Sequence, residues 1–161
     1  MSLLLISDQR TIKPISQNNE NKFNDLLEMT LIKDIKPLLG YYFYQDIIQN
    51  PTSTANKTLL DGGTYTYSGV TYTFKGLKYV IAYFLYANYI FSNIADTFTG
   101  FVVKSNEDSQ PASQGDKKNL RDINIEVAMQ HWDDCKMFIM ANSPDYPNFI
   151  YKQKNNRMII L

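Results

Sequence analysis

The first third of the chain carries apolar residues at helical spacing. Ser16 is a good N-cap residue, and Glu20 follows in a first turn, where the helix dipole favours an acid. Pro37 and Gly40 predict the end of this helix, because an interior proline removes a hydrogen bond and clashes with the preceding turn. A shorter helix is predicted over residues 38–49, closed by Asn50-Pro51. The first helix is predicted by apolar positions at steps of three, one and four residues: Phe23, Leu26, Leu27, Leu31 and Ile35.

Between this helical region and the next lies a stretch with a different period, GTYTYSGVTYTF. Aromatic and β-branched residues alternate with Thr and Ser on either side of the Ser68-Gly69 dipeptide, which predicts a β-hairpin over about residues 64–74. Residues 1–15 are predicted to be extended, and residues 51–62 to form a polar loop. An isolated hairpin is marginal in water, so this one is expected to pack on its own helices or on a neighbouring chain. The alternating large residues are Tyr65, Tyr67, Val70, Tyr72 and Phe74.

The most apolar stretch of the chain is Gly76–Ile94, GLKYVIAYFLYANYIFSNI. A membrane-spanning helix needs about 20 predominantly apolar residues, with its tyrosines near the two interfaces. Here tyrosines occur along the whole length and Asn88 lies inside, which favours a buried helix with a second stripe that meets a partner. One side holds Leu77, Ile81, Phe84, Leu85 and Asn88, and the second stripe holds Tyr79, Tyr83, Tyr86 and Ile90.

The last third of the chain predicts a short strand at Phe101–Lys104, a long helix from Gln114 to Asn142 and an extended arm over residues 143–161. Ser143-Pro144 ends the helix, and removal of Asn148–Leu161 is expected to leave the fold intact. The apolar side of the helix is predicted to be Leu120, Ile123, Val127, Trp132, Cys135 and Ile139.

The arm combines apolar and basic residues. Apolar groups on both sides of a basic run suggest extended pairing with a sheet edge or groove of another chain. The basic residues are candidates for facing DNA, and the plain alternative is a solubilising stretch. The apolar residues are Phe149, Ile150, Tyr151, Met158, Ile159, Ile160 and Leu161, and the basic ones are Lys152, Lys154 and Arg157.

Composition limits the classes of function. The 161 residues, 44% hydrophobic, suit one domain, predicted over residues 1–142 and followed by the arm. Sixteen Lys and Arg balance sixteen Asp and Glu, whereas a protein that depends on phosphate contacts usually has a basic surplus. The single cysteine excludes an internal disulfide framework, and the N-terminal apolar residues lack the basic flank of a signal peptide, so intracellular synthesis is expected.

Catalytic and metal-binding patterns are weak. His131 and Cys135 are four residues apart on a predicted helix, with Asp134 on the same side, but a closed zinc site needs four ligands and the chain has no second His or Cys. No GxSxG motif and no Gly-rich phosphate loop occur. We therefore expect no metal, no cofactor and no enzymatic activity, and assign no catalytic residue. The fold class expected is mainly α, a bundle of three to four helices with an inserted hairpin and an extended arm.

The ordered layout resembles the head–tail connector, or adaptor, proteins of tailed bacteriophages, and most closely those of crAss-like phages of Bacteroides-type hosts. The resemblance covers about residues 15–142. The hairpin GTYTYSGVTYTF has no place in the general family pattern. The likeness rests on IKPLLGYYFYQDII after the first helix, on GLKYVIAYFLYANYI, on TFTGFVVKSNEDSQP, and on the long helix and arm that follow.

The resemblance implies a structural virion protein at the head–tail junction, assembled in the host cytoplasm. Copies would form a homo-oligomeric ring, a dodecamer matching the portal, through a head-to-tail contact that rotation closes. The ring would bind the portal protein and the next tail protein, and double-stranded DNA would pass through it without specific binding. The tyrosine stripe, the hairpin and the arm are the candidate interfaces. The alternatives are a tail-completion or stopper ring protein, a small nucleic-acid-binding or ligand-binding regulator, and a membrane-associated protein.

Overall fold

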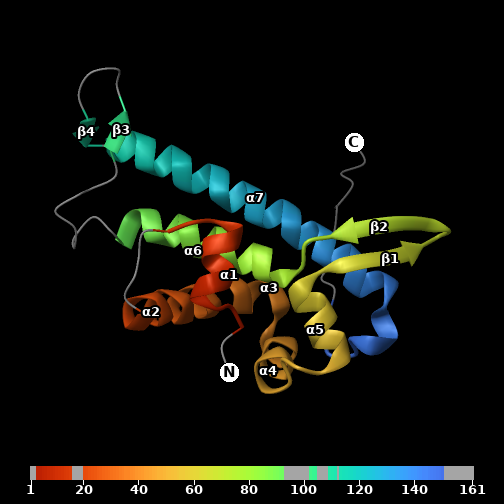
Figure 1. Cartoon of the computed structure of the whole chain (residues 1–161). Coiled ribbons are helices and arrows are strands. Elements are labelled where there is room, and N and C mark those ends of the chain that lie inside the picture. Colours follow the sequence, from red (N-terminus) through yellow and green to blue (C-terminus); the bar gives the residue numbers. More distant parts are fainter. Residues whose placement is uncertain (1–2, 16–19, 93–101, 105–108, 112, 151–161) are drawn as a thin grey trace, which may run out of the picture.

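The computed structural model describes residues 3–15, 20–92, 102–104, 109–111 and 113–150. Helix α6 (Leu77–Ser92) lies at its centre, and α1 (Ile6–Ile12), α2 (Glu20–Thr30), α5 (Thr54–Asp61) and α7 (Gln114–Ala141) pack around it (Figure 1). Between α2 and α5 the chain forms α3 (Lys36–Leu39) and α4 (Tyr41–Gln49). The mainly helical fold with an inserted hairpin is confirmed.

The predicted first helix continues through Pro37 and ends at Gly40, which has a left-handed φ of 78°. A π-helical segment, Leu31–Ile35, joins α2 to α3, and the Lys36 N–H donates to the Leu31 carbonyl. Wide turns of this kind occur inside helices as single-turn bulges. The prediction that Pro37 ends the helix is therefore wrong. The proline lies in the first turn of α3, where its missing N–H costs least.

Two short helices occur where residues 1–15 were predicted to be extended and residues 51–62 to form a polar loop; both predictions are wrong in these parts. Helix α1 occupies part of residues 1–15, and the Leu5 N–H donates to the Asp8 carboxylate at its start. Helix α5 occupies part of residues 51–62, where the Ser53 hydroxyl accepts from the Asn56 N–H as an N-cap. Both helices are short, and their stability depends on packing against α6 rather than on intrinsic propensity.

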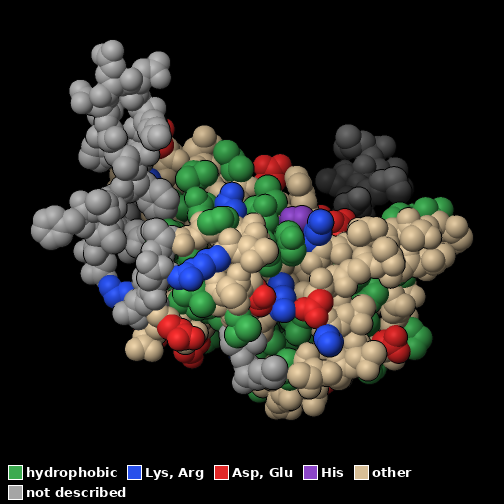
Figure 2. All heavy atoms as spheres, viewed as in Figure 1, with side chains coloured by type: hydrophobic (Ala, Val, Ile, Leu, Met, Phe, Trp, Pro, Cys, Tyr) green, Lys and Arg blue, Asp and Glu red, His purple; other side chains and the backbone are tan. Residues whose placement is uncertain are grey.

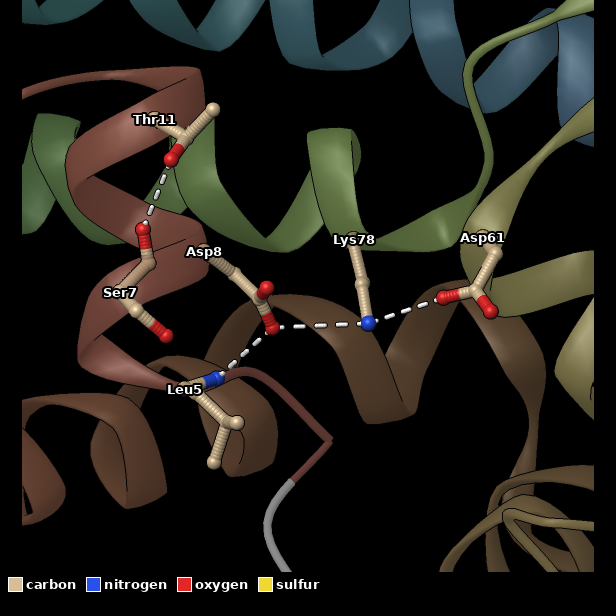
Figure 3. Close-up of polar contacts among 6 residues, drawn as sticks. All are labelled: Leu5, Ser7, Asp8, Thr11, Asp61 and Lys78. Atoms are coloured by element: carbon tan, nitrogen blue, oxygen red, sulfur yellow. Dashed lines mark hydrogen bonds and ion pairs between the residues drawn. The ribbon is translucent and has the colours of Figure 1, made fainter.

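Lys78 of α6 ties these short helices together. Its Nζ lies 3.4 Å from the Asp8 carboxylate and 2.8 Å from the Asp61 carboxylate (Figure 3). The hydrogen bond to Asp61 is the largest cause that raises the pKa of Lys78, against a smaller opposing effect of burial. One cation on the central helix thus fixes the ends of two helices that are far apart in the sequence.

A second polar link joins α6 to the π-helical segment. The Asn88 amide donates to the Thr30 hydroxyl over 3.1 Å and to the Asp34 carboxylate over 2.7 Å, and its carbonyl accepts from Lys33. Asn88 is buried, so these bonds satisfy a polar group that would otherwise destabilise the core. The asparagine within the apolar stretch is therefore a fixed point of helix packing.

The hairpin is formed by β1 (Gly63–Tyr67) and β2 (Val70–Phe74), paired antiparallel with Tyr65 opposite Tyr72. Ser68 and Gly69 both have positive φ, as the tight turn of a two-residue hairpin requires. A second pair, β3 (Val102–Lys104) and β4 (Ser109–Pro111), precedes α7. The strand predicted at residues 101–104 is thus present over its described residues, 102–104.

Helix α7 begins at a capping box formed by Ser113 and Asp116, which satisfies two backbone N–H groups at the helix start. Its buried line differs from the predicted one in the N-terminal half. Leu120 is exposed and Ile123 is 49% exposed, whereas Asn124 and Ala128 are buried. The C-terminal half agrees with the prediction: Trp132, Cys135 and Ile139 are buried.

The chain after α7 turns back onto the core rather than leaving it. A 3-10 turn, Ser143–Asp145, follows the helix, and Tyr146 is buried. The Tyr146 hydroxyl donates to the Ala55 carbonyl of α5 over 2.8 Å. Phe149 packs at 5.4 Å from Phe43 between ring centroids. The domain therefore extends to about residue 149, beyond the boundary predicted at residue 142.

Candidate interaction surfaces

The tyrosine stripe of α6 forms a half-buried row along one side of the helix. Tyr79 and Tyr83 each lie 5.5 Å from the ring of His131 on α7. The Lys13 Nζ, just after α1, lies 5.4 Å from the centre of the Tyr83 ring and 4.8 Å from that of Tyr86. The stripe therefore has partners within its own chain, and what it offers to another molecule is a mixed surface of phenol rings and cations.

Burial sets the charge state of this row. Burial is the largest effect on the pKa of His131 and lowers it. The nearby Asp134 raises this pKa, and Lys75 lowers it. Burial likewise raises the pKa of Tyr86. His131 is the only histidine of the chain, and Figure 2 shows it, in purple, at the surface with basic and acidic side chains close by. At neutral pH the row therefore carries its positive charge on lysines, with the histidine neutral.

The hairpin has two chemically different faces. Its aromatic face is buried at the base, where Phe74 stacks on Phe138 with centroids 4.2 Å apart. Toward the turn the same face becomes exposed, with Tyr72 at 41%, Tyr67 at 45% and Val70 at 52%. The tip projects beyond the helices (Figure 1). Exposed aromatic and β-branched residues on a projecting hairpin are typical of a contact surface.

The opposite face of the hairpin consists of threonines. Thr64 and Thr66 on β1 stand opposite Thr73 and Thr71 on β2, and all four are exposed. Tyr65 belongs to the aromatic face but is only partly exposed, because it packs 5.5 Å from Phe138. Of the three predicted hairpin contacts, Tyr67 and Tyr72 are therefore available and Tyr65 largely supports them.

A groove of about 460 Å³ lies beside β1, between the hairpin, α5 and the end of α7. Tyr65, Phe138 and Tyr146 supply its aromatic surface, and Asp145 is its charged residue. Phe138 and Tyr146 are buried and form an aromatic floor, whereas threonines and Asn142 make much of the remaining lining polar. The sequence does not predict this groove, because its walls include Ala55 and Tyr146, which are 91 residues apart. The alternating threonines predict an exposed face of this strand, but they do not show which of its edges is free.

The structure describes the predicted arm only as far as Ile150. Phe149 packs on Phe43 and Trp132, so it supports the fold, whereas Ile150 is 73% exposed. The remaining predicted arm residues lie outside the part of the chain that the structure describes: Tyr151, Lys152, Lys154, Arg157, Met158, Ile159, Ile160 and Leu161.

Two exposed tyrosines were not among the predicted contacts. Tyr41 and Tyr42 begin α4, and their rings meet edge to face at 5.4 Å. Lys36 lies 5.2 Å from the centre of the Tyr41 ring. The sequence signal was present, because the helix over residues 38–49 needs only one apolar side, and Phe43, Tyr44 and Ile47 supply it.

The residues considered for metal binding differ in their burial and surroundings. Cys135 is buried, and burial raises the pKa of its thiol, whereas His131 lies in the tyrosine row. Across the described residues, no three His, Cys, Asp or Glu side chains gather in a way that could hold a metal ion. None of the helices within those residues combines the length and apolar character needed to cross a membrane.

Residues 35–159 match the protein family DUF6712, a family of unknown function. The match covers most of the chain, so the chain belongs to this family. No curated protein and no solved structure matches the chain significantly. The matched region begins in the π-helical segment and contains the hairpin, α6, α7 and the groove.

Proposed function

We propose that this protein is a structural component of a tailed-phage virion, a head–tail connector that forms a ring below the portal and continues the DNA channel. Its sequence resemblance to connector proteins supplies the class. The observation that carries the proposal is that one chain presents two different aromatic surfaces. These are the hairpin tip, with Tyr67 and Tyr72, and the tyrosine row of α6.

A cyclic ring needs two distinct surfaces on each copy, because each copy contacts its two neighbours through different patches. Aromatic residues suit such contacts, since they bring a large area at a low cost in side-chain entropy. The zero net charge also suits a channel wall that lets DNA pass without holding it. The ring, its dodecameric size, its portal and tail partners and its place in the virion are parts of this proposal.

Native mass spectrometry of the full chain over a wide range of concentrations tests the ring. We expect a closed species of about a dozen copies, or one that appears when the portal protein is added. The variant Tyr67→Thr/Tyr72→Thr should shift the population to monomer, because it removes exposed aromatic area and keeps strand propensity.

The matched control for this variant is Tyr42→Ala, which removes a more exposed tyrosine from α4, outside both surfaces. It should leave the ring intact. A compact dimer that never grows would contradict the proposal, because an isologous contact closes on itself. The rival assignment, a tail-completion or stopper ring, predicts the same ring but no binding to a portal.

A nucleic-acid-binding role is the second candidate, favoured by one observation. Lys13 and Lys75 lie over the rings of the tyrosine row, and aromatic rings interleaved with cations can hold single-stranded nucleic acid. This role predicts affinity that falls steeply with salt, and loss of that affinity in Lys13→Ala/Lys75→Ala. Absence of binding at low salt would remove it.

A further inference from the structure

One edge of strand β1 is not paired with β2 and can bind another strand. In a hairpin with a two-residue turn, the residues flanking the turn exchange hydrogen bonds, and this exchange recurs at every second pair. Tyr67 and Val70 flank the turn, so Tyr65 also bonds to its partner, Tyr72. Thr64 and Thr66 consequently direct their backbone N–H and C=O groups away from β2.

These outward groups face the groove. Thr64 and Thr66 both line it, and no backbone group of the described residues outside the hairpin bonds to either one. Exposed strand edges are templates for an added strand, and proteins usually cover or charge them. The edge of β1 instead opens onto an aromatic floor, which is the arrangement that binds extended peptides through backbone pairing and side-chain pockets.

The chemistry of the groove specifies the peptide. Tyr65, Phe138 and Tyr146 favour aliphatic side chains, and Asp145 favours a cation next to them. The segment that follows Ile150, YKQKNNRMIIL, contains three basic residues and no acidic one, and places Arg157 directly before Met158–Leu161. This segment thus offers both kinds of side chain that the groove lining can contact.

We propose that residues Arg157–Leu161 of a second copy dock in this groove as a strand added to β1, with Arg157 against Asp145. The chain passes the groove at Tyr146 and then moves away, because Phe149 lies against Trp132, six residues before Phe138 on α7. The six residues between Ile150 and Arg157 span up to about 20 Å when extended, which is the reach available before the docked segment begins. This inference deepens the proposed ring by naming a segment exchanged between its copies.

Disulfide trapping between full-length chains tests the docking. Two variants, Thr66→Cys and Ile159→Cys, are mixed and oxidised. The native Cys135 is buried and does not compete, since the thiolate is the reactive form and burial raises the pKa of this thiol. We expect a linked two-chain product. The control pair is Thr11→Cys with Ile159→Cys, because Thr11 is an exposed threonine on α1, away from the hairpin (Figure 1).

Exchanging the charges of Asp145 and Arg157 gives a second test. A misfolded variant could lower the yield of linked product, but it would not regain that yield when the second change is added. Asp145→Lys in the receiving chain, or Arg157→Glu in the donating chain, should each lower the yield of linked product about two- to fivefold. The combination should restore it. Failure of the combination to restore the yield would overturn the pairing of Arg157 with Asp145.

Three results would overturn the docking proposal. One is equal linkage in the Thr11 control, and another is no linkage at Thr66. The third is an intrachain disulfide, with no two-chain product, in a chain that carries both Thr66→Cys and Ile159→Cys. Native mass spectrometry of the same samples separates the two proposals: a ring without linkage leaves the connector role standing, whereas monomers without linkage count against both.

Discussion

At the scale of single residues, Tyr146 joins three parts of the molecule. Its hydroxyl donates to the Ala55 carbonyl of α5, and its ring meets Phe43 of α4 and Phe138 of α7 at 5.9 and 5.8 Å. It is also part of the floor of the groove. One side chain from the segment after α7 therefore closes the core and shapes a candidate binding surface.

Tyr146→Phe isolates the contribution of the hydroxyl group. It keeps the ring contacts and removes the donor to Ala55, so we expect a loss of about 1 kcal/mol in the free energy of unfolding. For a chain of this length that corresponds to a fall in Tm of about 2–4 °C. Tyr72→Phe, at an exposed site on the hairpin, should stay within about 0.5 kcal/mol of the parent in the same urea and thermal experiments.

Alkaline pH provides a second test of Tyr146. Burial, and then the nearby Asp145 charge, raise the pKa of this phenol above its ordinary value of 10.0. Below pH 10 the phenol is protonated in both the folded and unfolded states, so its contribution to stability is complete. Above pH 10 the unfolded chain ionises first, and stability falls. The urea midpoint should decline above pH 10, and less steeply in Tyr146→Phe; equal slopes would contradict the assignment.

At the scale of elements, the structure separates what periodicity can predict from what packing decides. The hairpin, α4, α6 and α7 have strong local signals, namely alternation, turn residues and long apolar stretches. Helices α1 and α5 have weak ones, since each is short and is held by contacts with α6. The exposed Ile123 lies on a stretch of α7 where apolar spacing alone could not identify the side that meets α6.

The π-helical segment did leave a signal in the sequence. Phe23, Leu27, Leu31, Ile35 and Leu39 are all buried and follow one another at strict four-residue steps. Each such step passes one regular helical turn by about 40°, which accumulates to about 160° over the run. A wide turn at Leu31–Ile35 takes up much of this drift and keeps all five residues on one side.

The base of the hairpin depends on two glycines in mutual contact. Gly62 and Gly76 both have positive φ, and a Cβ on either one would meet backbone atoms of the opposite segment. The two points where the chain enters and leaves the hairpin are therefore pressed together. This contact fixes how the hairpin leaves the helical core, and with it the position of the groove beside β1.

Gly62→Ala should cost clearly more than Gly69→Ala in the free energy of unfolding. Both changes place a side chain at positive φ, which costs about 1–2 kcal/mol. Gly69 has no atom within 4 Å of the added Cβ, whereas at Gly62 the Cβ meets the backbone of Lys75 and adds about 1–3 kcal/mol of overpacking. Equal losses in urea unfolding would show that strain, and not close approach, is what these glycines relieve.

At the scale of the whole molecule, two truncations locate the end of the domain. A chain ending at Ile150 should keep its Tm close to that of the full chain, whereas a chain ending at Pro147 should lose about 1–2 kcal/mol with the partly buried Phe149. The sequence predicts that removal of Asn148–Leu161 leaves the fold intact. Because Phe149 packs on the core, we now expect this removal to lower stability. Equal Tm values for the two truncated chains would show that Phe149 contributes nothing.

The candidate surfaces were predictable to different degrees. The tyrosine stripe and the hairpin face follow from periodicity, because residues on one side of a helix or strand can be read from spacing. Their partners within the chain, Lys13 and His131, could not be read in this way, since they come from α7 and from the chain after α1. The groove depends on the packing of three elements, which no local pattern specifies.

The wide turn at Leu31–Ile35 has a consequence for the ancestry of this chain. A single-turn π bulge is equivalent to one extra residue accommodated inside a regular helix, with both flanking helices left in place. Relatives that lack the residue should therefore align with a one-residue gap here, and one of their four-residue apolar steps should shorten to three. Helix α2 would keep its orientation in those relatives. The distribution of that gap among relatives would show which members of the family share the wide turn.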